Sequence, residues 1–215
     1  MNRPFKLTTA CIAALLALAC AIGTSHADKL EDDEDGWTPL FNGKDLTGWH
    51  TSPGGEWKVV DGVIVGTSPK SERRHGLLIS DKAYSDFEVR LQFKVTSGDS
   101  GFYFRSTPVE HVVGIKGFQV EVDRTLDTGG LYETLGRAWV VKPDHEAMKE
   151  VYKPGEWTDL RVKAVGKNIT VWVNGKQTAE LTDDPGAVKG HFALQLHGGD
   201  TMDVAYKGIK IREIK

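Results

Sequence analysis

Cysteine is almost missing from this sequence, which excludes two chemical devices. Both cysteines, Cys11 and Cys20, lie within the first 22 residues of the 215-residue chain. A disulfide needs paired cysteines and thiol chemistry needs at least one, so neither is available to the rest of the chain. We therefore expect a domain that is held together by a hydrophobic core.

Apolar runs long enough to cross a membrane are also missing. The longest mostly apolar stretch, residues 7–22, is shorter than the about 20 residues of a membrane-spanning helix. It follows Arg3 and Lys6 and precedes Ser25-His26-Ala27, which places small residues where a signal peptidase reads. We interpret residues 1–27 as a signal peptide cleaved after Ala27. The sequence thus predicts an exported protein, periplasmic or extracellular, with no membrane span.

A surplus of positive charge is absent too. The chain has 27 Lys and Arg residues against 30 Asp and Glu residues, and loss of Arg3 and Lys6 with the signal peptide leaves 25 against 30. Nucleic acids and anionic membranes need a basic face, so this balance argues against both as partners. Residues 28–36 form an acidic leader, and residues 37–215 have the length of a single domain.

Helical periodicity and the signatures of several enzyme classes are missing as well. There is no P-loop, dinucleotide fingerprint, Gly-x-Ser-x-Gly elbow or His-Glu-x-x-His motif. Strand-like runs recur instead, with hairpin signals at Asp61-Gly62 and Asn174-Gly175, and residues 71–75 are interpreted as a solvated connection. The runs are residues 57–66, 85–95, 100–105, 117–123, 157–165, 169–173, 191–197 and 204–214. We predict an all-β fold, a two-sheet antiparallel β-sandwich of the jelly-roll type.

Polar residues share one face of three of these strands. Successive side chains of a strand point to opposite faces, so apolar alternation leaves the polar members on the other face. These polar members are Tyr103, Arg105, Gln119, Glu121, Asp123, Gln195 and His197. If the three strands are neighbours, the polar groups converge on one concave surface that can take a polar ligand. The alternative is an ordinary sheet face that is wetted by solvent.

The least regular stretch, residues 123–157, carries aromatic and polar residues of the kind that bind sugars. They are Tyr132, Glu133, Arg137 and Trp139. Aromatic faces stack on the C–H surfaces of a sugar, and polar groups orient its hydroxyls. We therefore interpret these residues as substrate-binding candidates; the alternative for Trp139 is a core position in a short strand.

Seven segments together carry a family resemblance. They are WTPLFNGKDLTGWH (37–50), DSGFYFRS (99–106), GFQVEVD (117–123), TGGLYE (128–133), PGEWTDLRV (154–162), VNGK (173–176) and ALQLHGG (193–199). In order and spacing they resemble the 3-keto-disaccharide hydrolase domain family, long called DUF1080, of the concanavalin A-like lectin and glucanase superfamily. The resemblance implies a sandwich fold and an exported enzyme. Its carbohydrate substrate would be a glycoside that a separate oxidoreductase has first oxidised at C3.

The implied chemistry begins with the acidity that a C3 ketone gives to the C2 proton. A base removes this proton, an enolate forms, the C1 substituent leaves and water adds. Glu121 or His197 is the implied base, Arg105 or a divalent cation the implied enolate stabiliser, and the remaining acid the proton donor. A metal ion, if one is used, would be held by Glu121, Asp123 and His197.

Two other functions remain open at this point. Laminarinase-like retaining glucanases on the same fold carry Glu-x-Asp-x-Glu on one strand, and Glu121-Val122-Asp123 matches its first half. The residues that follow, 124–127, contain no Glu for the second catalytic carboxylate. The other alternative is a non-catalytic, lectin-like carbohydrate-binding module, because a fold alone never establishes activity.

Overall fold

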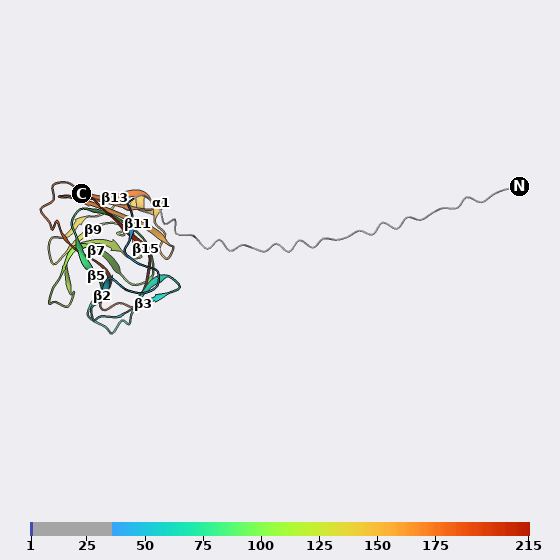
Figure 1. Cartoon of the computed structure of the whole chain (residues 1–215), viewed down its shortest axis with the longest axis horizontal. Helices are drawn as coiled ribbons and strands as arrows, with labels where there is room; N and C mark the ends of the chain where they lie inside the picture. The colour runs from blue at the N-terminus through green and yellow to red at the C-terminus, as the bar shows by residue number, and fades with distance from the viewer. Residues whose placement is uncertain (2–35) are drawn as a thin grey trace. The chain divides into compact units, whose positions relative to one another are not determined.

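The computed structural model describes Met1 and residues 36–215, and the latter form an almost purely β architecture (Figure 1). The predicted signal peptide and acidic leader therefore lie outside the described residues, apart from Met1 and Gly36. Residues 36–215 belong to one compact unit. The one helix in this part of the chain is α1 (His145–Val151), and no described helix is long and apolar enough to cross a membrane.

Two antiparallel sheets make up the fold, which confirms the predicted β-sandwich. Sheet A has the strand order β13 (Lys176–Leu181), β12 (Asn168–Val173), β11 (Thr158–Val165), β6 (Phe87–Ser97), β15 (Met202–Glu213), β4 (Val63–Ser68) and β3 (Glu56–Val60), with β1 (Thr38–Pro39) also paired to β15. Sheet B has the order β10 (Ala138–Val141), β9 (Leu131–Thr134), β8 (Ile115–Val122), β7 (Ser100–Pro108), β14 (Gly190–Leu196), β5 (Gly76–Tyr84) and β2 (Trp49–Thr51).

Both predicted hairpin turns are present. Asp61 and Gly62 join β3 to β4 with φ angles of 50° and 77°, and Asn174 and Gly175 join β12 to β13 with φ angles of 47° and 80°. Two consecutive positive φ angles match the right-handed twist of the flanking strands, and Asn, Asp and Gly adopt them most easily. Local turn chemistry therefore fixes these two pairings.

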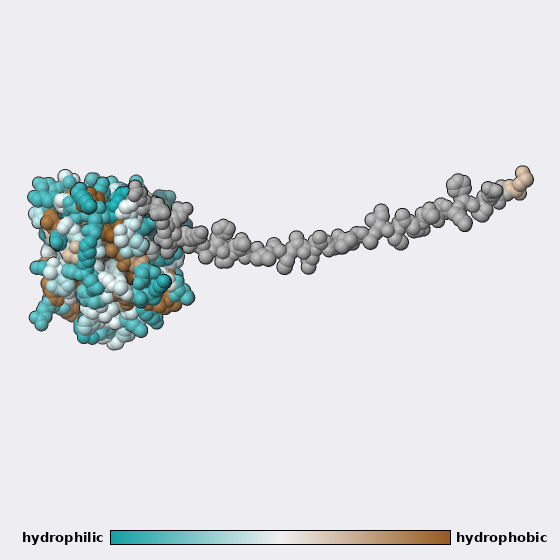
Figure 2. Space-filling view, in the orientation of Figure 1, coloured by the Kyte–Doolittle hydropathy of each residue, from teal (hydrophilic) through white to brown (hydrophobic). Residues whose placement is uncertain are grey.

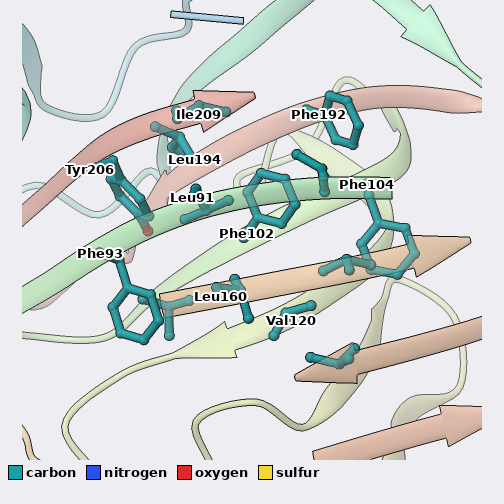
Figure 3. Packing of buried hydrophobic residues seen from close by; sticks show 14 of the residues in the cluster. Leu91, Phe93, Phe102, Phe104, Val120, Leu160, Phe192, Leu194, Tyr206 and Ile209 are labelled. Carbon is teal, nitrogen blue, oxygen red and sulfur yellow. The ribbon is translucent and has the colours of Figure 1, made fainter. Parts of the chain in front are cut away.

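The main core lies between the sheets, where the apolar faces of their strands meet. Leu91 and Leu160 come from sheet A, and Phe102, Phe104 and Phe192 come from sheet B (Figure 3). All five are buried, and burial of one such side chain stabilises the fold by roughly 1.5–3 kcal/mol. Hydrophilic residues, by contrast, cover most of the face seen in Figure 2, with apolar residues in small separate groups.

A second, smaller apolar cluster lies on the outer face of sheet B. It consists of Leu77, Ile79, Tyr103, Ile115 and Ala193, with Val113 of the β7–β8 loop packed against it. Strand β5 is therefore buried on both faces, and its sequence GLLIS shows no alternation that would have predicted it. Part of the outer face of sheet B is thus covered by other residues of the chain and is not exposed to solvent.

The stretch that looked irregular, residues 123–157, is partly regular. It contains β9, β10 and the seven-residue helix α1. Asp144 caps this helix, because its side chain accepts hydrogen bonds from the backbone N–H groups of Glu146 and Ala147. The strands are only four residues long, too short for alternation to identify them in the sequence.

Candidate functional site

A pocket of about 370 Å³ opens on the outer face of sheet B. Its walls come from strands β7 to β10 and β14, and from residues next to the ends of β5, β7 and β14. The lining residues are His75, Asp99, Tyr103, Val113, Gln119, Glu121, Tyr132, Thr134, Leu135, Trp139, Gln195 and His197. Seven of these were candidates from strand parity or from the sugar-binding residue types.

One row of side chains crosses four neighbouring strands of this face. In the strand register Tyr103 lies opposite Gln119, Gln119 opposite Tyr132, and Tyr132 opposite Trp139. The rings of Tyr132 and Trp139 meet edge to face with centroids 5.5 Å apart. The row therefore gives the pocket an aromatic wall beside a polar floor, as sugar sites commonly have.

Two carboxyl groups, those of Asp99 and Glu121, meet at the base of the pocket. Asp99 comes directly before β7, and Glu121 lies opposite Gly101 in the β7–β8 pairing. The two side chains hydrogen-bond to each other. Burial raises the pKa of both carboxyls, and the negative charge of Asp99 raises the pKa of Glu121 further, well above its ordinary value. Two carboxyls in contact in a largely buried place do not both ionise readily, so the charged form of Glu121 is disfavoured in the folded protein.

A directed chain of hydrogen bonds leads across the pocket floor to Glu121. Gln195 Nε2 donates to Tyr103 Oη at 3.1 Å, and Tyr103 Oη lies 3.0 Å from Thr134 Oγ1. Thr134 Oγ1 donates to Gln119 Oε1 at 3.2 Å, and Gln119 Nε2 donates to Glu121 Oε2 at 3.3 Å. Because Thr134 gives its only hydroxyl proton to Gln119, the Tyr103 hydroxyl donates to Thr134 Oγ1. All links thus run in one direction, and Glu121 Oε2 is held as an acceptor.

The two histidines of the pocket differ in their hydrogen-bond roles. Gln195 Nε2 also donates to His75 Nδ1 at 2.9 Å, so the proton of a neutral His75 sits on Nε2. Burial, aided by the neighbouring His197 ring at 4.4 Å between centroids, lowers the pKa of His75 to about 4. His75 is therefore a neutral N–H donor at physiological pH. His197 Nδ1 lies 3.2 Å from Asp200 Oδ2.

Unpartnered polar atoms gather in this pocket. In the described part of the chain five buried side-chain N or O atoms lack a hydrogen-bond partner, and three of them are Asp99 Oδ1, Gln195 Oε1 and His197 Nδ1. Buried polar atoms are nearly always hydrogen-bonded in native proteins, because leaving one unpaired costs about 1–3 kcal/mol. His197 Nδ1 has the Asp200 carboxylate 3.2 Å away, so Asp99 Oδ1 and Gln195 Oε1 are the two left unpaired in this pocket, and they indicate a site that is completed by a polar ligand.

Arg105 does not belong to this site, contrary to the parity argument. A register shift after Phe104 and a φ of 49° at Arg105 form a β-bulge that turns its side chain away from the pocket. The guanidinium is buried and donates to the carbonyl oxygens of Ser85 and Gly166 and to Asp86 Oδ1. The parity argument assumes that successive residues alternate between the two faces of the strand. A bulge inserts an extra residue, so the face assigned to every later residue of that strand is wrong.

Asp123 also lies outside the pocket lining. Its carboxylate accepts hydrogen bonds from the backbone N–H of Thr125 and from the hydroxyls of Thr125 and Thr128, which closes the turn after β8. The predicted metal ligands Glu121, Asp123 and His197 are therefore not brought together, and within residues 36–215 no three His, Cys, Asp or Glu side chains are placed to hold a metal ion.

Glu133 and Arg137 are likewise not part of the pocket lining. Arg137 pairs with Glu133 and forms a two-pronged ion pair with Asp184, with both N–O distances at 2.8 Å. The Arg137 guanidinium also lies over the ring of the buried Phe118, 5.8 Å from its centroid. These residues close the edge of the sandwich and have a structural role there.

Three polar pocket residues were not candidates from the sequence. His75 lies at the end of a segment interpreted as a solvated connection, Asp99 precedes the strand whose parity was used, and Thr134 ends the short β9. All three stand at strand ends, where alternation carries no information. The motif DSGFYFRS did contain Asp99, so the family resemblance was the one signal that included it.

The fold and this site together define a carbohydrate-active domain built on a lectin-like β-sandwich. Residues 36–212 match the model of a family described as the 3-keto-alpha-glucoside-1,2-lyase-like domain, and the chain belongs to this family. The resemblance noted in the sequence motifs is thereby confirmed.

Individual relatives agree with this assignment at the level of fold and broad class. An extracellular exo-alpha-L-arabinofuranosidase of Streptomyces chartreusis is 25% identical over 174 residues, 76% of this chain and 19% of that protein. The chain thus spans about a fifth of that relative. A candidate glycosyl hydrolase from Parabacteroides distasonis superposes with a TM-score of 0.63 at 24% identity, over 84% of this chain and 94% of the other. The carbohydrate-binding module CBM66 of Bacillus subtilis superposes with a TM-score of 0.56 at 18% identity, over 76% and 95%.

Proposed function

We propose that this protein cleaves glycosides whose sugar carries a ketone at C3, by proton abstraction at C2, elimination at C1 and hydration. The observation that carries the proposal is the Asp99–Glu121 pair in the pocket, where two carboxyls hydrogen-bond to each other and where burial and the Asp99 charge raise the pKa of Glu121 well above its ordinary value. Such a pair offers one carboxylate as a base and one carboxylic acid as a proton donor, side by side.

The reacting atoms of a keto-glycoside fit this arrangement. The ionised member of the pair takes the C2 proton, and the electrons move toward the C3 oxygen to give an enolate. The protonated member gives its proton to the C1 oxygen, the C1–O bond breaks, and a C1–C2 double bond forms. Water then adds at C1 and a proton returns to C2, which gives the free keto-sugar. C1 and C2 are adjacent, so two carboxyls in contact can serve both.

The enolate oxygen needs hydrogen-bond donors, and Arg105 is not available for this role. His75 lines the pocket as a neutral imidazole with its proton on Nε2, and we assign it to the C3 oxygen. Gln195 Oε1, which has no partner, and His197, which lines the pocket, are assigned to sugar hydroxyls. Tyr132 and Trp139 provide the apolar wall for the ring.

The proposal requires that another enzyme supplies the keto-sugar. A C3 ketone is absent from ordinary glycosides, so a sugar-oxidising oxidoreductase must act first in the same compartment. The similarity to an extracellular arabinofuranosidase and the predicted signal peptide support export to the periplasm or the extracellular space as that compartment.

The test compares a 3-keto-disaccharide with its unoxidised parent. We expect release of the leaving sugar from the keto form alone. Glu121→Gln and Asp99→Asn should each lower the rate by about 10²–10⁴-fold and leave binding of the substrate nearly unchanged. Asp81→Asn, at an exposed carboxylate paired with His50, is the matched control and should keep full activity. Equal cleavage of the parent sugar contradicts the proposal.

The second candidate is a non-catalytic sugar-binding module, which the unpaired Asp99 Oδ1 and Gln195 Oε1 and the aromatic wall also fit. In that case both sugars bind, neither is cleaved, and Glu121→Gln changes only affinity. A retaining glucanase is disfavoured, because its two carboxyls stand about 5–5.5 Å apart across the bond whereas Asp99 and Glu121 touch.

A further inference from the structure

Leu135, in the turn between β9 and β10, has a backbone conformation that favours glycine. Its φ angle is 54°, in the left-handed region, where the Cβ of an L-residue crowds the backbone and where Gly or Asn is better tolerated. The chain has a glycine one position later, at Gly136. The Leu135 side chain is 51% exposed and belongs to neither apolar cluster of the fold. Neither the backbone geometry nor core packing therefore accounts for a leucine here.

The turn that carries Leu135 is held in place by several polar contacts. The N–H of Gly136 donates to the carbonyl oxygen of Glu133 at 3.1 Å, and Arg137 also pairs with Glu133. Arg137 binds Asp184 through two N–O contacts of 2.8 Å, and Asp184 lies in the connection between β13 and β14. A residue that is kept in an unfavourable conformation on such a fixed support is typical of a functional position.

Leu135 lines two neighbouring cavities. It forms part of the wall of the pocket on sheet B and, together with Thr134, part of the wall of a second cavity of about 210 Å³. The second cavity is also lined by Gly117 and by Thr107 and Lys116, which lie opposite each other in the β7–β8 pairing. The pocket therefore has a continuation past Leu135, toward the start of β8.

Strand β8 runs from one cavity to the other. Glu121 and Gln119 line the pocket, and Gly117, which follows them in the same alternation, lines the second cavity. Four residues of a strand span about 13 Å, which is longer than one six-membered sugar ring. A sugar that reacts at Glu121 therefore leaves room for a further part of the substrate beyond it.

The strand order of sheet B indicates which part of the substrate lies there. His75 directly precedes β5, Glu121 lies on β8, and Leu135 lies between β9 and β10, so the three follow one another across the sheet. In the proposed reaction C3 faces His75, and C2 and C1 face the two carboxyls. The order C3, C2, C1 thus runs toward β9 and β10, and the C1 substituent is the part that reaches Leu135.

We propose that Leu135 is a specificity residue that contacts the leaving group at C1, and that this group presents the apolar face of a ring. An apolar ring and the C–H face of a second sugar both offer this chemistry. A half-exposed leucine gains free energy when such a face covers it, whereas a methyl group covers little of it. The inference rests on the proposed function, because only cleavage defines a leaving group.

The test uses 3-keto-glucosides that differ only in the leaving group, which is methyl, cyclohexyl or glucosyl. Methanol and cyclohexanol are alcohols of similar acidity, so a difference between their glycosides reports contacts with the protein. We expect kcat/KM to be roughly tenfold higher for a ring than for methyl, mainly through a lower KM. The ring form with the higher value shows whether the contact suits an apolar ring or a sugar. Equal kcat/KM for the methyl and ring forms overturns the inference.

Variants of the turn locate the contact. Leu135→Asn suits the positive φ angle but removes the apolar surface, so it should reduce the preference for rings roughly tenfold without lowering the urea midpoint. Leu135→Met keeps an apolar side chain and should keep most of the preference. Val60→Asn changes a 43% exposed apolar residue in β3 of sheet A and, as the matched control, should leave the preference as it is. A preference that survives Leu135→Asn contradicts the role of Leu135.

Binding measurements separate this inference from the proposed function. The affinities of the methyl and cyclohexyl forms are compared by calorimetry in Glu121→Gln, in which turnover is suppressed. If the wild type cleaves all three glucosides with equal kcat/KM, only the role of Leu135 fails. If it cleaves none, the proposed function fails. Tighter binding of the cyclohexyl form that is lost in Leu135→Asn would then still support Leu135 as a ring contact, and equal binding of both forms would refute it.

Discussion

In the Asp99–Glu121 pair, the property that the proposed function needs is also one that lowers the stability of the folded protein. Each carboxyl alone is easily accommodated at a surface, but burial of both in contact means that ionisation of the pair is unfavourable. The same unfavourable term favours the protonated form of Glu121, which the proposed chemistry uses as an acid. The function proposed for these residues therefore predicts that they destabilise the folded chain.

Removal of the Glu121 charge should stabilise the protein in a pH-dependent way. The folded pKa of Glu121 lies above the ordinary value of 4.5, so the folded state binds this proton more tightly than the unfolded state does. Its contribution to stability is therefore fully present below pH 4.5 and is lost as the pH rises through the folded pKa. We expect Glu121→Gln to unfold at higher urea than the wild type at pH 8, with a smaller difference at pH 4. A difference that does not vary with pH contradicts the raised pKa.

Only glycine fits at position 101, because a side chain of the neighbouring strand packs over it. A Cβ at this position would stand 2.6 Å from the side-chain amide of Gln119, which packs over the glycine. Gly101→Ala should therefore displace Gln119 and break its bonds to Thr134 and Glu121. Because displacements of about 1 Å in a site can cost 10²-fold, we expect turnover to fall by ten- to a hundredfold with little change in the unfolding midpoint. Unchanged turnover would show that the hydrogen-bond chain is dispensable.

At the scale of elements, strand β7 joins the two sheets through its bulge. Its first half presents Tyr103 to the pocket, and after the register shift Arg105 reaches into the rim of the sandwich. Gly190 permits this, since a Cβ there would lie 2.3 Å from the backbone carbon of Arg105. The strand thus serves the site with one part and the fold with the other.

Replacement of Arg105 should affect stability and not chemistry. Arg105→Gln would leave the carbonyl oxygens of Ser85 and Gly166 without their donor and Asp86 without its cation, at a cost of about 3 kcal/mol. We expect a lower urea midpoint and an unchanged kcat/KM per folded molecule. The opposite result, normal stability with a large loss of kcat/KM, would support the role that strand parity suggested.

At the scale of the molecule, one core joins both sheets. The buried cluster that contains Leu91 and Phe93 of sheet A also contains Phe102 and Phe192 of sheet B. Neither sheet can expose its inner face without the other doing so. We therefore expect residues 36–215 to unfold in one cooperative transition, with coincident midpoints by far-ultraviolet circular dichroism and by tryptophan fluorescence. Separate midpoints would show that one sheet outlasts the other.

The net charge of the whole molecule does not show how the charged residues are distributed over its surface. The balance of 27 basic against 30 acidic residues argued against any basic face. The fold nevertheless places seven Lys and Arg side chains together with three acidic ones on the outward positions of β6, β11 and β15, while the carboxyls of Asp99 and Glu121 meet at the pocket on sheet B. Net charge constrains the average field of a protein and leaves its distribution to the strand order.

The sequence by itself determined what depends on near neighbours in the chain. Alternation with a period of two located the long strands such as β6 and β8 and assigned Gln119 and Glu121 to the outer face. Turn chemistry located both hairpins. The lack of cysteine after Cys20 indicated that a hydrophobic core, and not disulfides, stabilises the fold. The family motifs indicated the carbohydrate-active class, because their order and spacing can be recognised in the sequence without the fold.

Only the tertiary structure decided which residues form the site. Asp99 meets Glu121 because β7 and β8 pair in one register, and His75 joins them because β5 lies beside β14. Arg105 leaves the site because a bulge reverses its parity, and Asp123 because a turn uses its carboxylate. Strand order, register and bulges are set by packing between residues far apart in the chain. Local patterns contain no information about that packing. The sequence therefore located the strands, whereas only the fold showed which functional side chains meet.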